Sequence, residues 1–236
     1  MKRKMSIFTL VLVSALFSAC GKSDVTGTSQ QENVNTTSRM TDQITETVVH
    51  NQDKRSLVIY FDYSENIDTT GMDVDAISTA SLRGGSNGSN IENMQVMVKE
   101  VKDLKSADVY SIRVNEVYPA LFDDMTGMAK DDITDDRQFT FKEELTGLEN
   151  YDTVYIGVPV WWGELPQPVQ VFFDKYDFSG KTLVPFGIHH GSGFGRMVIQ
   201  MREYEPDAEV LAGFTINADT DNNSVKEQFD EYLGGL

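Results

Sequence analysis

Five short runs of mostly apolar residues stand out after residue 55. They are rich in β-branched and aromatic side chains, and three of them are nearly continuous in apolar character. Such runs are typical of strands that are buried on both faces of a parallel sheet. We therefore predict strands at residues 56–61, 108–114, 153–158, 182–188 and 209–217.

Apolar residues between and after these runs recur at helical spacing. The clearest stripe repeats at intervals of 3, 4, 3 and 3 residues and comprises Ile91, Met94, Val98, Val101 and Leu104. It predicts one buried helix face, and Ser89 and Glu92 have the spacing of a capping box at the helix start. We predict three further helices around residues 169–176, 197–204 and 225–233.

The alternation of strands and helices predicts an α/β fold with a parallel sheet and helices on both faces. Ligands of such sheets bind outside the carboxyl ends of the strands. The segments that directly follow the strands are therefore the first candidates for a site.

The first 19 residues have the layout of an export signal. A basic segment at 2–4 precedes an apolar stretch at 6–17, which is too short for a permanent membrane helix. Two small residues then precede Cys20, which resembles a bacterial lipobox; the alternative is an ordinary signal that leaves an unpaired cysteine. We expect residues 1–19 to be a lipoprotein signal peptide, and Cys20 to anchor the protein outside the cytoplasm on a bacterial membrane.

The composition divides the rest of the chain and limits its function. Residues 20–55 are rich in Thr, Ser, Gln and Asn without a sustained apolar period, so we expect a flexible tether before a domain at 56–236. The 37 acidic and 20 basic residues give a net charge of −17, which argues against nucleic-acid binding and favours basic partners or none. A single cysteine excludes an internal disulfide and a cysteine-based metal site within one chain.

Two of the segments after predicted strands are unusual. The first, at 62–88, has 27 residues where about two to six are usual, and its hydroxyl and amide side chains and Arg83 could bind an anion. The second contains both tryptophans of the chain, Trp161 and Trp162, directly before Gly163. This pair suits the stacking of a planar ligand, and the alternative is helix packing or a partner interface.

A third segment, at 189–196, contains two histidines and three glycines before a predicted helix. The glycines allow the backbone to approach a ligand closely, although a flexible turn would have the same composition. Ser192 lacks the G-x-S-x-G spacing of a nucleophile elbow, which argues against a hydrolase.

Taken together, several motifs resemble the flavodoxin-like family, in its branch with a WWG signature. They are Tyr151-Asp152, Gly157 to Gly163, Pro166 with Pro168, Tyr176 to Thr182, and His189 with Gly191 to Arg196. The resemblance covers about residues 57–236. It implies a three-layer flavodoxin-like fold with a five-stranded parallel sheet in the order 2-1-3-4-5. It also implies noncovalent FMN and electron transfer or flavin-dependent reduction.

The resemblance also implies where FMN would bind. Its ring would contact Val160, Trp161, Trp162, Gly163, His189, Gly191, Ser192 and Gly193. The family holds the phosphate with a turn of the form S-x-T-G-N-T after the first strand. Here only Ser64 and Asn66 match at that place, and a second partial match, Ser89 and Asn90, lies at the start of the first helix.

Carboxylates surround this altered phosphate loop. Asp62, Glu65 and Glu92 would each repel a phosphate if unpaired, whereas Arg83 could bind it. Two functions therefore stay open. One is an FMN-binding redox protein of the cell envelope. The other is a flavodoxin-fold lipoprotein that has lost or weakened FMN binding and acts as a binding module.

Overall fold

The computed structural model describes residues 55–68, 93–119 and 122–236, and within these ranges it contains a six-stranded parallel sheet. The path runs from β3 (Asp108–Ser111) through β1 (Ser56–Tyr60), β5 (Thr153–Pro159) and β6 (Thr182–His189) to β7 (Glu209–Val210). This is the expected order 2-1-3-4-5, so the predicted fold class is confirmed.

The predicted fifth strand is the exception, because it is divided in two. β7 and β8 (Phe214–Asn217) both pair with β6, and they are separated by residues 211–213, which end at Gly213. Gly213 has a φ of 81°, a left-handed conformation that extended strands do not adopt. The backbone therefore leaves the sheet briefly and returns to it.

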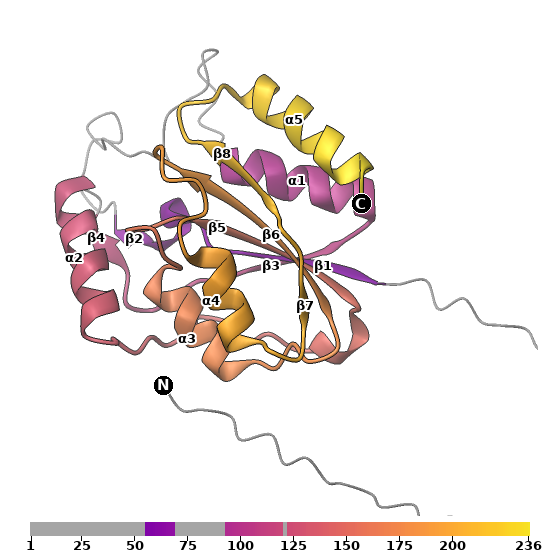
Figure 1. Cartoon of the computed structure of the whole chain (residues 1–236). Coiled ribbons are helices and arrows are strands. Elements are labelled where there is room, and N and C mark those ends of the chain that lie inside the picture. Colours follow the sequence, from indigo (N-terminus) through magenta and orange to yellow (C-terminus); the bar gives the residue numbers. More distant parts are fainter. Residues whose placement is uncertain (1–54, 69–92, 120–121) are drawn as a thin grey trace, which may run out of the picture. The chain divides into compact units, whose positions relative to one another are not determined.

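Helices cover both faces of this sheet, as Figure 1 shows. α1 (Asn93–Lys105) and α5 (Asn222–Gly234) lie on one face, and α3 (Gln167–Lys175) and α4 (Met197–Tyr204) lie on the other. The central strands β1, β5 and β6 are buried along most of their length because each of their faces meets a helical layer.

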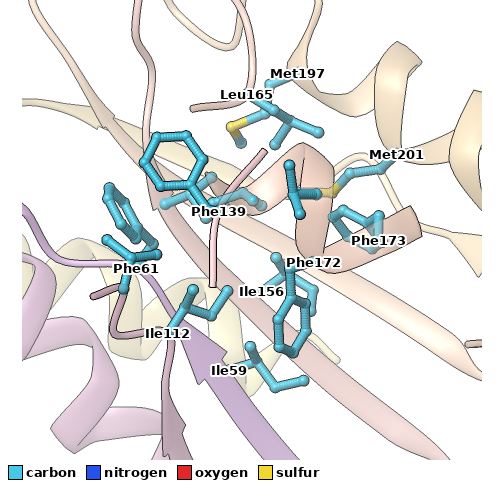
Figure 2. Close-up of a cluster of buried hydrophobic side chains, with 14 of the residues drawn as sticks. Ile59, Phe61, Ile112, Phe139, Ile156, Leu165, Phe172, Phe173, Met197 and Met201 are labelled. Atoms are coloured by element: carbon cyan, nitrogen blue, oxygen red, sulfur yellow. The ribbon is translucent and has the colours of Figure 1, made fainter. Parts of the chain in front are cut away.

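The core is divided into two clusters by the sheet. On the α3 and α4 side, Ile59 of β1 and Ile156 of β5 pack with Phe172, Phe173 and Met201 of the helices (Figure 2). On the α1 and α5 side, the buried residues are Val58, Met94, Met97, Val98, Val101, Ala107, Tyr155, Val184, Phe186, Ile216, Val225, Phe229 and Leu233.

The buried stripe of α1 differs from the predicted one at its end. Met94, Val98 and Val101 are buried as expected, but Met97 is completely buried and Leu104 is 54% exposed. In the last turn it is Lys105, not Leu104, that lies toward α5, because Lys105 Nζ donates to the Leu233 carbonyl oxygen (2.8 Å). The predicted capping pair, Ser89 and Glu92, lies outside the described residues.

Several elements were not predicted from the sequence. Two short parallel strands, β2 (Ile67–Asp68) and β4 (Tyr118–Pro119), form a second small sheet, and α2 (Phe122–Thr134) follows it. Two 3₁₀ turns, η1 (Tyr63–Asn66) and η3 (Leu148–Asn150), lie outside the main sheet. The first residues after β1 therefore fold into η1 and β2, although the sequence suggested a loop from residue 62.

The expected signal peptide and most of the expected tether lie outside the described residues, as does residue Cys20. Among the helices that the structure describes, none has the length and apolar character needed to cross a membrane.

Candidate functional site

Two of the three segments selected from the sequence meet at the carboxyl end of the sheet. β5 and β6 are neighbours, with Pro159 opposite Ile188, so residues 160–166 and 190–196 emerge side by side. Backbone hydrogen bonds join them, from Val160 N–H to Ile188 O (2.8 Å) and from Arg196 N–H to Gly163 O (2.6 Å). We call these two segments the paired loops.

A tight turn decides how the two tryptophans are presented. Trp161 and Glu164 exchange backbone hydrogen bonds of 3.1 and 2.9 Å, and the two residues between them, Trp162 and Gly163, have φ values of 53° and 78°. Positive φ at both central residues is typical of a type I′ turn. The turn sends the neighbouring side chains in opposite directions, so Trp161 is 8% exposed and Trp162 is 58% exposed.

Trp161 is consequently part of the core and is not half of an exposed aromatic pair. Its ring packs edge-on against Tyr118, Phe61 and Tyr63, with centroid distances of 5.1, 5.5 and 6.3 Å. The interpretation of both tryptophans as one flat platform is therefore wrong for Trp161. Only Trp162 offers its ring to solvent at the paired loops.

Trp162 is held by α2, the helix that the sequence did not predict. Its indole N–H donates to the carbonyl oxygen of Thr126 (3.0 Å), and Lys130 Nζ lies 5.1 Å from the ring centroid. The exposed ring is thereby fixed in direction by a hydrogen bond and a cation–π contact.

The glycines of the paired loops leave open space beside the backbone. Gly163, Gly191 and Gly193 have φ values of 78°, 88° and 59°, and a Cβ added at any of them would meet nothing within 4 Å. Gly195 is different, because a Cβ there would lie 2.3 Å from the Gly163 carbonyl oxygen. Three glycines therefore border free space, and Gly195 lets the two loops touch.

His189 ends β6 at the entrance of the second loop. Its Nδ1 accepts a hydrogen bond from the Gly191 N–H (2.8 Å), and Ser192 Oγ donates to the Gly193 carbonyl oxygen (3.1 Å). The pKa of His189 lies below its usual range, mainly because the ring is partly buried and in addition because His190 is its neighbour. The neutral ring with an accepting Nδ1 carries its proton on Nε2.

The predicted phosphate residues after β1 are placed differently from the expectation. Asn66 is completely buried, and its amide donates to Asp62 O (2.8 Å) and Ile112 O (3.1 Å) and accepts from the Val114 N–H (2.8 Å). These bonds join the segment after β1 to residues 112–114, which follow β3. The strand was predicted to continue through these residues, but it ends at Ser111. The Asn66 amide is fully used within the protein, so we correct its assignment as a phosphate ligand.

The two carboxylates of this segment have separate surroundings. Asp62 is 2% exposed and accepts hydrogen bonds from the Ser64 N–H (3.0 Å) and the Ser64 Oγ (3.1 Å). Glu65 accepts hydrogen bonds from Tyr60 Oη (2.5 Å) and from Ser111 Oγ. The pKa of Tyr60 is raised, mainly by its burial and in addition by its hydrogen bond to Glu65. Ser64 thus binds a carboxylate of its own chain.

Glu65 also lines a hollow of about 550 Å³ at the edge strand β3, away from the paired loops. The other residues that line this hollow are Tyr60, Val109, Tyr110, Ser111, Arg113, Lys142 and Glu143. The rest of the inserted segment, with Arg83, Ser89, Asn90 and Glu92, lies outside the described residues. Asn93 is the first described residue of α1, and its amide donates to Ala218 O (3.1 Å) and Thr220 O (2.9 Å).

Several solved structures have a fold similar to that of this chain. One is a crystal structure of a protein from Bacteroides uniformis that is described as a flavoprotein. It has 20% sequence identity to this chain and a TM-score of 0.55, and the match covers 77% of this chain and 98% of that one. A similarly assigned protein from Bacteroides eggerthii has 19% identity, a TM-score of 0.52 and coverage of 76% and 98%. A Lactobacillus acidophilus flavoprotein solved in complex with FMN has 18% identity, a TM-score of 0.48 and coverage of 74% and 97%.

A search of curated protein sequences finds no match. The model of the flavodoxin family, in contrast, matches residues 88–232. The match begins one residue before Ser89 and leaves out β1 and most of the inserted segment. Because it covers more than half of the 236 residues, the chain belongs to the flavodoxin family.

Proposed function

We propose that this protein is a redox protein that binds FMN noncovalently at the paired loops. The observation that carries the proposal is the open space beside Gly163, Gly191 and Gly193, in the same paired loops as the exposed ring of Trp162. Membership of the flavodoxin family supports FMN as the cofactor. Planar ligands are bound by such a combination of an aromatic ring and closely approaching backbone.

The residues present fit the ring better than the phosphate. Trp162 would contact the isoalloxazine ring, and the glycine backbone would approach it without steric conflict. His189 would keep the second loop in shape through its bond to Gly191 and remain uncharged near neutral pH. When bound, the flavin supplies the electron transfer, while the protein sets its position and electrostatic surroundings.

Two observations favour a different phosphate end of the site from the one expected after β1. Asn66 is occupied inside the protein, whereas the family match begins at residue 88 and includes Ser89 and Asn90. We therefore assign the phosphate end of the site to Ser89 and Asn90 rather than to Ser64 and Asn66. The choice between an electron carrier and a flavin-dependent reductase depends on a redox partner that acts on the bound flavin.

The experiment that tests the proposal is a titration of the full chain with FMN, followed by flavin fluorescence and tryptophan fluorescence. The variant Gly191→Ala should weaken FMN binding about tenfold or more, because its methyl group enters the open space. Gly180→Ala is the matched control, since Gly180 also has a positive φ, 75°, and open space around its Cβ position. No FMN binding by the folded wild-type protein would reject the proposal.

A second function is favoured by one observation. The Ser64 N–H and hydroxyl bind the Asp62 carboxylate, so donors at the head of β1 are already engaged by an anion of the same chain. A protein of this kind that binds no flavin would be a binding module built on a flavodoxin fold. The titration separates the two functions directly, because only the redox protein would retain a flavin.

We also propose that the protein is a lipoprotein anchored outside the cytoplasm of a bacterium. The order of a basic segment, a short apolar stretch and small residues before Cys20 supports this. Replacing Cys20 with Ser should move the protein from the membrane fraction to the soluble extracytoplasmic fraction. Unchanged membrane association of that variant would contradict the proposal.

A further inference from the structure

The carboxylate of Asp62 lies where the end of β1 meets the first turn of α1. One of its oxygens accepts from the N–H and the hydroxyl of Ser64, at 3.0 and 3.1 Å. The other oxygen lies 3.4 Å from the amide nitrogen of Gln95, in the first turn of the described helix. A backbone N–H, a hydroxyl and a side-chain amide are the donors that an anion takes at such a place in an α/β fold.

This internal anion is well shielded from water. Asp62 is 2% exposed, and it directly follows Phe61, which is completely buried in the core. Among the described residues, its hydrogen-bond donors are Ser64 and Gln95, and neither of them is charged. Repulsion between like charges is weakened much less in such surroundings than at an exposed position.

We infer that Asp62 is a specificity-determining residue, which makes the flavin site prefer flavins with little negative charge at the ribityl end. The inference rests on the proposed function. Asp62 takes the Ser64 donors that a phosphate would use at the end of β1, and it adds a negative charge there. Riboflavin should therefore bind nearly as tightly as FMN, within about tenfold. Glu65 contributes less, because it is less buried than Asp62 and lines the hollow at β3.

The test compares riboflavin and FMN affinities of the full chain for the wild-type protein and two variants. Asp62→Asn should strengthen FMN binding about 10- to 100-fold and change riboflavin binding less than about threefold. Glu65→Gln removes an equal charge in the same segment and should change the ratio of the two affinities less than about threefold. Circular dichroism and thermal unfolding establish that each variant is folded.

A second measurement needs no variant. The second ionisation of a phosphate monoester has a pKa of about 6, so lowering the pH from about 7.5 to about 5.5 removes charge from FMN but not from riboflavin. FMN should then gain affinity relative to riboflavin, whereas a site that attracts phosphate would lose it. His189 lies at the entrance of the paired loops, at the ring end of the proposed site, and affects both ligands alike. The titratable groups near Asp62 are Tyr60 and Glu65, which are hydrogen-bonded to each other.

The outcomes distinguish a failure of the proposed flavin site from a failure of the role of Asp62. Failure of the folded protein to bind either flavin would reject the proposed function, and the inference with it. Binding of FMN more than about 100-fold tighter than riboflavin would overturn the role of Asp62 alone and leave the flavin site in place. Equal effects of Asp62→Asn and Glu65→Gln on the affinity ratio would also overturn it.

Discussion

The paired loops and the segment after β1 lie at the same end of the sheet but differ in how their polar groups are used. In the paired loops, three glycines at positive φ border open space. In the segment at 61–68, Asn66 makes three buried hydrogen bonds and Asp62 binds Ser64. One region is open to a ligand, whereas the other satisfies its own donors and acceptors.

The difference has a physical reason. A buried amide or carboxylate without partners is costly, so a buried segment rich in polar side chains becomes stable only when these side chains bind one another or nearby backbone. Glycine has no side chain to bury, so a glycine loop can remain at the surface with its backbone accessible. The paired loops can therefore stay accessible while the polar segment after β1 is used up by its own hydrogen bonds.

The largest effect is expected at the contact between the two regions, where the Trp161 ring packs on Phe61 and Tyr63. Trp161→Ala should lower the free energy of unfolding by about 3–5 kcal/mol, because it leaves a cavity in the core. Trp162→Ala is the control and should cost less than about 1 kcal/mol while weakening flavin binding. Equal losses in urea denaturation would show that the two side chains do not differ in burial.

The next effect tests whether Asn66 is structural. Asn66→Ala should lower the free energy of unfolding by about 3 kcal/mol, since the Val114 N–H and the Ile112 carbonyl lose a buried partner. Ser64→Ala removes only one hydroxyl bond and should cost less than about 1 kcal/mol. If Asn66→Ala instead weakened FMN binding at unchanged thermal stability, Asn66 would be a ligand, and the segment after β1 would be open to FMN like the paired loops.

A smaller effect is expected within the paired loops. Gly195→Ala places a methyl group 2.3 Å from the Gly163 carbonyl oxygen and should destabilise the protein by about 2 kcal/mol. Gly193→Ala, at a similar φ of 59° but in open space, should cost only about 1 kcal/mol of backbone strain. Chemical denaturation of the two variants without flavin measures the difference, and equal costs would mean that the loops separate easily.

The smallest effect concerns His189. Because its pKa is lowered in the folded protein, the unfolded state binds the proton first, and stability falls as the pH drops below about 6.5. The ring is only partly buried, so we expect His189→Gln to reduce this loss by less than about 1 kcal/mol. Thermal unfolding of both proteins at about pH 7.5 and about pH 5.5 measures the difference. A steeper loss in the variant would contradict the direction of the shift.

Much of the fold could be predicted from the sequence because its signals are local. Continuous apolar runs indicated β1, β5 and β6, and helical spacing indicated α1, α3, α4 and α5. α2 was missed because few of its side chains meet the core, with Met125 and Ala129 among the buried ones. The small β2–β4 sheet joins segments of two residues each, which are too short to show a period.

The sequence by itself determined the α/β class, the position of the paired loops after their strands, and the glycine content that keeps them accessible. Only the tertiary structure decided which tryptophan is exposed, since this depends on the positive φ of Trp162. It also decided that Asn66 is bound within the fold, through partners 46 and 48 residues away. Local patterns record which residues are buried, but hydrogen bonds between distant segments form only when the chain has folded, and they decide which polar groups remain free for a ligand.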